Sequence, residues 1–144
     1  MLVQQILNSK ASNSVVTVKP GTLVRDAAQI LADKRIGTVV ISASGDTADG
    51  ILSERDIVRE LAARGAPCLT EKVDTYMTSK LVTCTRADSA DSVLHRMTEG
   101  RFRHMPVVEE GKLIGLITLG DAVKARLSEL AMEKDALEGM IMGH

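Results

Sequence analysis

The sequence predicts an α+β fold in which two strand–helix–strand–strand–helix (βαββα) repeats pack pseudo-symmetrically, with an extra N-terminal segment and a long C-terminal helix. Val16-Thr17-Val18 recurs as Val82-Thr83-Cys84, 66 residues later, and Gly50-Ile51-Leu52-Ser53 with Asp56 recurs as Gly115-Leu116-Ile117-Thr118 with Asp121, 65 residues later. Two matches in one order at nearly one offset indicate two copies of one unit. Each copy is too short to bury a good core alone, so we expect the copies to pack together around a ligand cleft.

The first copy is expected over residues 12–66. Its strands are predicted from β-branched runs and its helices from apolar residues at helical spacing. Thr22 is the predicted N-cap of the first helix, and Ser53 is the predicted start of the second. In chain order the predicted elements are a helical stripe over 1–10, a loop over 11–14, a strand over 15–18, a helix to Lys34, strands over 38–42 and 50–52, and a helix that ends at Gly65.

The second copy is expected over residues 80–128, after an inter-repeat connection over 67–79. Val73, Tyr76 and Met77 make the connection apolar, so we expect these residues to dock on the fold. The predicted elements of the second copy are a strand over 81–85, a helix capped by Asp88, a buried strand over 105–108, a turn at Glu110-Gly111, a strand over 113–117, and a helix from Thr118 to about Met142.

The last helix carries more apolar residues than one copy needs, and its extension covers residues 129–144. Apolar surface that remains after the core is filled usually packs against a partner. We therefore expect a homodimer. The apolar stripe consists of Leu127, Leu130, Ala131, Leu137, Met140 and Ile141.

Composition excludes several classes of partner. The 144 residues include 18 Lys and Arg against 19 Asp and Glu, so no overall field favours nucleic acid or an anionic membrane. No apolar run reaches the roughly 18 residues of a membrane-spanning helix, and we expect no signal peptide. Cys68 and Cys84 fit a cytoplasmic chain with reduced thiols. With His95 and His144 they lack the spacing of metal ligands.

A hydroxyl and a carboxylate open the last helix of each copy, as Ser53 with Asp56 and as Thr118 with Asp121. Two interpretations stay open. The pair is close to a capping box, which stabilises a helix by about 1 kcal/mol. Alternatively, the free N–H groups and the positive end of the helix dipole bind an anion, and the hydroxyl adds a bond to phosphate. The carboxylate is then placed to accept hydrogen bonds from the two hydroxyls of a ribose.

The order βαββα, repeated twice, resembles a tandem pair of cystathionine β-synthase (CBS) domains, also called a Bateman module. The resemblance rests on the closing strings GILSERDIV (50–58) and GLITLGDAV (115–123) and on RHMPVV (103–108), and it covers about residues 12–128. It implies a free-standing regulatory module with no catalytic domain. The first copy departs from the pattern, because Gly37-Thr38 stands where the second copy has Arg103-His104. Two sites are therefore expected, but they cannot be equivalent.

The resemblance also implies roles for single residues. In the family, the aspartate of the closing string typically holds the ribose and the hydroxyl contacts phosphate, while positions matching Arg103 and His104 commonly contact phosphates. Arg55 is a further phosphate candidate, although a solvent-exposed arginine fits its position equally well. The cross-over geometry of the family implies that the Thr118/Asp121 site borrows Val16, Ile36 and Gly37, and that the Ser53/Asp56 site borrows Val82, Thr83 and His104.

An adenine base would need an apolar slot with backbone polar groups, because Tyr76 and Phe102 are the only aromatic residues and offer no stacking platform. Each slot candidate fits a plain core position as well. The candidates are Val16, Ile36, Gly37, Thr38, Ile51, Val82, Met105 and Leu116.

The sequence therefore predicts a regulatory module that binds an adenine nucleotide (AMP, ADP, ATP or NADH) and acts on a partner protein. No catalytic cofactor, metal, nucleic acid or membrane is expected as a partner. A ligand-independent scaffold for dimerisation or docking is the alternative. A nucleotide-processing enzyme is less favoured, because the sequence offers no paired catalytic carboxylates, activated nucleophile or metal cluster.

Overall fold

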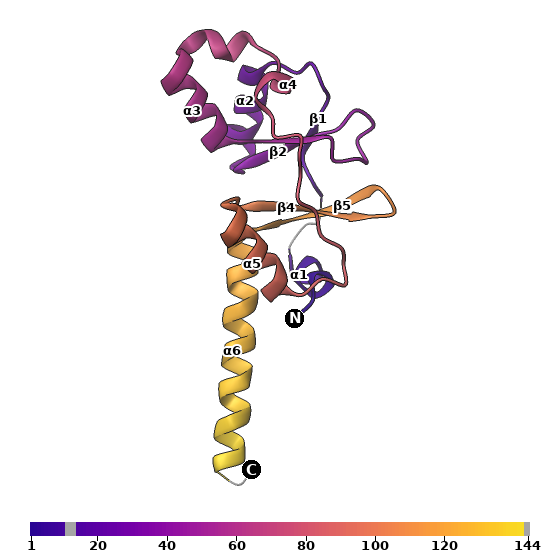
Figure 1. The fold of residues 1–144 in the computed structure, drawn as a ribbon, viewed down its shortest axis with the longest axis vertical. Helices are drawn as coiled ribbons and strands as arrows, with labels where there is room; N and C mark the ends of the chain where they lie inside the picture. The colour runs from indigo at the N-terminus through magenta and orange to yellow at the C-terminus, as the bar shows by residue number, and fades with distance from the viewer. Residues whose placement is uncertain (11–13, 143–144) are drawn as a thin grey trace.

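The computed structural model describes residues 1–10 and 14–142 and contains two α/β units from which one long helix projects (Figure 1). It confirms the predicted α+β class. Residues 11–13 of the predicted loop and His144 lie outside the described residues. The elements are α1 (Val3–Ser9), β1 (Thr17–Val18), α2 (Val24–Lys34), β2 (Thr38–Ile41), β3 (Gly50–Ser53), α3 (Glu54–Arg64), the 3₁₀ helix η1 (Ala66–Thr70), α4 (Val73–Tyr76), α5 (Ala90–Gly100), β4 (His104–Glu109), β5 (Lys112–Thr118) and α6 (Leu119–Ile141).

The first unit is a three-stranded sheet with the order β1-β2-β3, and α2 and α3 lie on one side of it. β1 runs parallel to β2, and β2 runs antiparallel to β3, with Thr38 opposite Ser53. Every residue of β2 is buried, as its β-branched run predicts. The aliphatic core of this unit consists of Val18, Val24, Ala27, Leu31, Val39, Ile41, Leu52, Ile57 and Val73.

The second unit is built on the antiparallel pair β4–β5, in which His104 lies opposite Thr118. α5 and the first turns of α6 pack on this pair, and so does α1. α1 therefore belongs to the core of the second unit although it precedes the first unit in the chain. The buried core residues here are Val3, Ile6, Leu7, Cys84, Ala90, Val93, Met97, Met105, Val107, Ile117, Ala122 and Ala125.

The two sheets lie between the helices of the two units (Figure 1). The loop before β3 reaches the β4–β5 hairpin, where the Leu113 N–H donates to the Asp46 carbonyl at 2.7 Å. The connection between the units docks on the first one, as predicted, since Val73 is fully buried and Tyr76 and Met77 pack against the same core. Among the described residues, no helix has the length and apolar character needed to cross a bilayer.

Two predicted helix caps are wrong. Thr22 does not cap α2, because its hydroxyl closes the preceding turn and Leu23 occupies the N-cap position without a side-chain hydrogen bond. Asp88 does not cap α5, because its carboxylate accepts from the backbone of the preceding turn and Ser89 is the N-cap. In both places the side chain forms a hydrogen bond with a backbone group of the preceding turn instead of with the helix start.

The first strand of each copy is shorter than predicted. β1 covers Thr17–Val18, and the strand predicted over 81–85 is wrong, because only Cys84 forms a β-bridge there, parallel to Val107. Two hydrogen bonds hold the bridge. The Cys84 N–H donates to the Pro106 carbonyl at 3.0 Å, and the Val108 N–H donates to the Cys84 carbonyl at 2.9 Å. A single bridge is enough to hold the chain against the edge of β4 without a longer ladder.

The position of α1 generates a stability prediction. Leu7 is 5% exposed and packs in the core of the second unit, so Leu7→Ala should lower the free energy of unfolding by about 2–5 kcal/mol. Urea denaturation followed by circular dichroism measures the loss. Asn8→Ala, on the exposed face of the same helix, is the matched control and should have little effect. Equal stability of the two variants would contradict the assignment of α1 to this core.

Candidate functional site

Both hydroxyl–carboxylate pairs form capping boxes. The Asp56 N–H donates to Ser53 Oγ at 3.1 Å, and the Ser53 N–H donates to Asp56 Oδ2 at 2.9 Å. Thr118 and Asp121 repeat this geometry at 3.1 and 2.9 Å. In each capping box the aspartate accepts through Oδ2, and its Oδ1 takes no part in the box. The capping interpretation is therefore confirmed, and it is compatible with a second role for the same carboxylates.

The strand arrangement places corresponding residues of the two units beside the two helix starts. Gly37 precedes β2 and Arg103 precedes β4. Their carbonyls accept hydrogen bonds from the first residues of α3 and α6, at 2.9 and 2.8 Å. The two positions are equivalent in the backbone, but only the second carries a cation. This difference in charge is the feature on which the predicted inequality of the two sites rests.

A large cleft of about 830 Å³ lies between the units at the start of α3. Ser53 and Asp56 reach it from the first unit, and Val82, Arg103 and His104 reach it from the second. This volume is typical of pockets that bind small molecules or cofactors.

The large cleft is rich in positive charge. Five lysines and arginines line it against two carboxylates, those of Glu54 and Asp56. Arg59 pairs with Asp56 on its own helix. Within residues 1–10 and 14–142, the other four cations form no ion pair. They are Arg55, Lys80, Arg101 and Arg103. Because these charges converge on one hollow, the cleft attracts anions.

A small cavity of about 470 Å³ lies on the other side of the contact between the units. Val16 and Ile36 from the first unit meet Leu116 from the second in its walls. Gly37, His104 and Thr118 line both cavities. The two cavities therefore adjoin at these three residues.

Lys10 covers the carboxylate beside the small cavity. Its Nζ donates to Asp121 Oδ2 at 2.8 Å and to the Leu116 carbonyl at 2.9 Å. Burial alone would raise the pKa of Asp121, but the hydrogen bonds from Lys10 and from the Thr118 N–H outweigh it and hold the pKa below its usual value. Asp121 is thus ionised and already has a cationic partner from the segment that follows α1.

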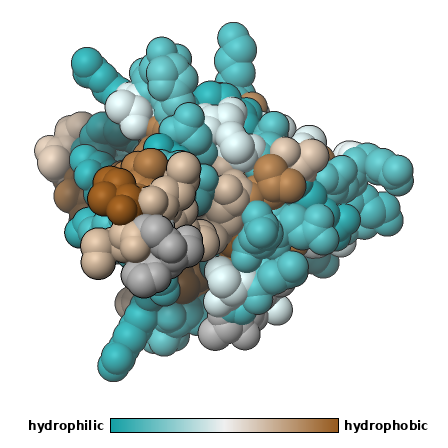
Figure 2. Space-filling model, turned by 90° about the horizontal axis from the view of Figure 1, so that it is seen from below, coloured by the Kyte–Doolittle hydropathy of each residue, from teal (hydrophilic) through white to brown (hydrophobic). Residues whose placement is uncertain are grey.

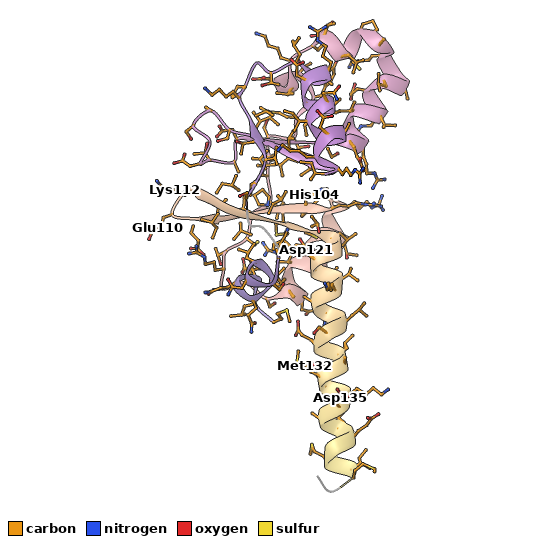
Figure 3. The ribbon with its side chains drawn as sticks, turned by 180° about the vertical axis from the view of Figure 1, so that it is seen from behind. His104, Glu110, Lys112, Asp121, Met132 and Asp135 are labelled. Atoms are coloured by element: carbon orange, nitrogen blue, oxygen red, sulfur yellow. The ribbon has the colours of Figure 1, made fainter. Side chains whose placement is uncertain are left out.

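His104 lies where the two units meet (Figure 3). Burial lowers the pKa of His104 below its usual value, and the charges of Lys10 and Arg103 lower it further, while Glu54 and Asp121 act in the opposite direction. The neutral imidazole is therefore favoured at neutral pH. A neutral His104 can donate one hydrogen bond to an anion and accept another from a donor.

Two arginines at the cavities adopt a strained backbone conformation. Arg35 ends α2 with φ of 54°, and Arg101 ends α5 with φ of 57°. Arg35 lines the small cavity and Arg101 the large one. The left-handed conformation costs a non-glycine residue about 1–2 kcal/mol, and glycine is usual at this point of a helix. Backbone strain of this kind is often found at binding sites, so it supports a binding role for the arginine side chains at the cavity walls.

Most of the predicted site residues line one of the two cavities. On the large cleft are Gly37, Ile51, Ser53, Arg55, Asp56, Val82, Arg103, His104 and Thr118; on the small cavity are Val16, Ile36, Gly37, Thr38, His104, Leu116 and Thr118. The structure thus brings Val16, Ile36 and Gly37 to Thr118, and it brings Val82 and His104 to Ser53.

Three predicted site residues line neither cavity. Met105 is fully buried in the core of the second unit, because side chains alternate along β4 and Met105 points away from the face of His104. Thr83 is exposed, and its carbonyl accepts from Arg96 at 2.9 Å. The carboxylate of Asp121 is paired with Lys10.

Several residues of the cavities escaped sequence reasoning. Arg59 lies one helical turn after Asp56, so helical spacing could have identified it. Lys10 is 111 residues from Asp121, and no local pattern connects the two. Phe102 lines the large cleft although no aromatic wall was expected there. Lys80, Arg101 and Glu54 also needed the tertiary structure.

The cysteines lie apart from both cavities and do not pair. Cys68 and Cys84 are free and buried. Burial raises the pKa of the Cys84 thiol to about 11, so the thiol stays protonated at neutral pH. In the described part of the chain, no group of three or more His, Cys, Asp or Glu side chains is placed to hold a metal ion.

Comparison with known proteins identifies the family. The family model for the CBS domain matches residues 3–63 and 73–128. The chain belongs to the CBS domain family and contains a tandem pair of these domains. It is 29% identical over 148 residues to a mitochondrial CBS domain-containing protein of Arabidopsis thaliana, a match that covers 98% of this chain and 72% of that relative. Several longer relatives are matched over about a quarter of their length.

Solved structures of CBS proteins share the fold. A CBS-domain-containing protein of Agrobacterium tumefaciens is 40% identical with a TM-score of 0.83, covering 88% of this chain and 99% of that one. A CBS domain protein of Pyrobaculum aerophilum, solved in complex with AMP, is 25% identical with a TM-score of 0.77, covering 92% of this chain and 99% of that one.

The pair formed by Lys10 and Asp121 generates a second prediction. Both side chains are about one quarter exposed, so removing the cation leaves a poorly solvated carboxylate. Lys10→Met should lower the free energy of unfolding by about 1–3 kcal/mol, measured by urea denaturation at pH 7. Lys19→Met, at an exposed position, is the control. A Lys10→Met protein as stable as the control variant would show that the ion pair contributes nothing to the fold.

The lowered pKa of His104 generates a third prediction. Below pH about 6.5 the unfolded chain binds a proton that the folded chain does not bind, so stability should fall as the pH drops from 7.5 to 5.5. His104→Asn should reduce this fall, measured by urea denaturation at both pH values. His95→Gln, exposed on α5, should leave the fall unchanged. An undiminished fall in His104→Asn would contradict the assignment.

Proposed function

We propose that this CBS pair is a regulatory module that binds an adenine nucleotide in the large cleft and transmits the bound state to a partner protein. The observation that carries the proposal is the convergence of four unpaired cations, within the described residues, on a cleft that also holds the Ser53/Asp56 helix start. The relative from Pyrobaculum aerophilum that was solved with AMP supports the choice of an adenosine ligand.

The chemistry of the large cleft suits the parts of a nucleotide. The positive end of the α3 helix dipole favours a phosphate in this cleft, although the Ser53 hydroxyl already donates to Asp56 Oδ2 at 2.9 Å. Asp56 is placed beside it to accept hydrogen bonds from ribose hydroxyls. Ile51, Val82 and Phe102 supply apolar wall for a base. The positive charge of the cleft favours ligands with several phosphates, ATP or ADP, over AMP, because each phosphate adds a charge-assisted contact.

The small cavity is proposed as a weaker site. A diol that approached Asp121 would compete with Lys10, which already donates to this carboxylate at 2.8 Å. In the first unit the corresponding carboxylate is paired with Arg59, whose side chain is 67% exposed, so water can take over its hydrogen bonds if the pair opens. The two sites therefore differ in the free energy needed to displace the cation from the aspartate before the aspartate can bind a ribose.

The proposed activity is binding and not catalysis, and the proposed assembly is a homodimer of cytoplasmic chains with repeats over residues 12–66 and 80–128. Thr118 lines both cavities and is also the N-cap of α6. A ligand that contacts Thr118 acts directly on the position of α6. Such a ligand changes the assembly only as far as its affinity differs between two states.

Isothermal titration with AMP, ATP and NADH tests the proposal, and we expect ATP to bind more tightly than AMP. Arg101→Gly should weaken ATP binding about 10-fold or more, by loss of a charge-assisted contact. The same change should stabilise the fold by about 0.5–1 kcal/mol, because it relieves the left-handed strain. If Arg101 had only a structural role, Arg101→Gly would change the stability of the fold and leave the affinity for ATP unchanged.

Arg35→Gly is the matched control, since it relieves the same strain at the small cavity and should leave ATP affinity nearly unchanged. Retention of full ATP affinity in Arg101→Gly would remove the role of this cation. Absence of binding with every nucleotide at millimolar concentration would remove the nucleotide proposal and leave a ligand-independent scaffold.

A further inference from the structure

Beyond its first turns, α6 has no cover in the described structure. Ala122 and Ala125 are its buried residues, and they pack on the second unit with α5. From residue 130 to the end of the helix no side chain is buried. Figure 1 shows this part projecting away from both units, with Met132 and Asp135 along it (Figure 3). An isolated helix of this length is marginal in water, so packing against a partner would account for its helical state.

Five exposed apolar residues of α6 follow a heptad pattern, while Met132 and Met140 lie off it. Val123, Leu127, Leu130, Leu137 and Ile141 are spaced by alternating steps of four and three, with Lys134 at the one remaining position. Leu127 is 63% exposed, Leu137 is 59% exposed and Ile141 is 84% exposed. Figure 2 looks toward the end of α6 and shows hydrophobic side chains gathered there. A narrow stripe of this period is the seam of a two-helix coiled coil.

Charge complementarity identifies the occupant and its direction. In a parallel pair, Glu133 of one helix would lie beside Glu138 of the other, twice in the dimer, and the two Lys134 side chains would face each other in the seam. In an antiparallel pair with full overlap, Val123 lies opposite Ile141 of the second copy. Lys124 then lies beside Glu138 of the second copy, and this attractive contact occurs twice because the dimer is symmetric. The two Glu133 side chains meet once near the two-fold axis, so the antiparallel pair has two attractive contacts against one repulsive contact, whereas the parallel pair has only repulsive ones.

We infer that the exposed seam of α6 binds α6 of a second copy of this chain in an antiparallel coiled coil. The inference rests on the proposed homodimer and specifies its interface. It does not depend on nucleotide binding, because the seam faces away from the buried side of α6 and lies outside both cavities.

The first test is the mass in solution without nucleotide, measured by sedimentation equilibrium on the full chain. The wild type should have about twice its 15.4 kDa mass. Leu127→Glu/Leu137→Glu, which places two carboxylates opposite each other in the antiparallel register, should raise the dimer dissociation constant by roughly 100-fold or more, without loss of circular dichroism from the two units. Met132→Glu, on the opposite side of α6, should leave the mass unchanged.

The direction of the pair is tested by charge exchange. Glu138→Lys should weaken an antiparallel dimer by roughly 2- to 10-fold, because the introduced ammonium group then meets Lys124, and adding Lys124→Glu should restore affinity. In a parallel dimer Glu138→Lys would instead tighten binding, because the introduced cation would meet Glu133. Disulfide formation gives an independent readout. A mixture of Val123→Cys and Ile141→Cys proteins should cross-link to each other, and Val123→Cys alone should not.

Three results would contradict the inference, each in a different way. A monomeric wild type would overturn both the seam and the proposed homodimer. A dimer that survives Leu127→Glu/Leu137→Glu would overturn the seam and leave a homodimer through another face. Tighter binding in Glu138→Lys, or cross-linking of Val123→Cys with itself, would overturn the antiparallel direction.

Discussion

The structure depends on the fact that each small sheet has helices on one side and the other repeat on the other side. α2 and α3 cover the first sheet, and α5, α6 and α1 cover the second. The remaining faces are covered only where the repeats meet. Because strands β3 and β5 both end at this contact, the helices that follow them begin there. The cavities exist because helix starts and loops, which fill space poorly, meet at the edges of the contact.

Capping and recognition use the same groups in this fold. Ser53 with Asp56 and Thr118 with Asp121 each satisfy two backbone N–H groups at the start of α3 and of α6, those of the cap residue and of the aspartate. The same geometry aims a helix dipole and a hydroxyl at the cavity. A helix start that stabilises the fold is thus also a polar corner that an anion can approach. The fold therefore needs no separate scaffold to present these groups.

The asymmetry of the two cavities comes from side chains that differ between corresponding positions of the two repeats. Arg103 has Gly37 as its counterpart, and Arg55 has Gly120, so cations gather at the large cleft. Lys10 follows α1 and reaches Asp121, whereas Lys80, at the corresponding point of the second family match, lines the large cleft. The backbones of the two repeats are thus alike at the two helix starts, while single side chains make the two cavities chemically different.

The internal repeat, the aliphatic periodicity and the helix-opening pairs were readable in the chain itself, because they depend on spacing along one segment. They determined the α+β class and the tandem CBS family, and most of the site residues that they predicted line one of the cavities. The caps at Thr22 and Asp88 and the strand over 81–85 were misread, because turns and a single bridge satisfied those groups instead. Only the tertiary structure decided which repeat α1 joins, that Met105 points into the core, and that Lys10 covers Asp121. These facts depend on contacts between residues up to 111 positions apart, and the interaction energy of such pairs leaves no trace in local sequence.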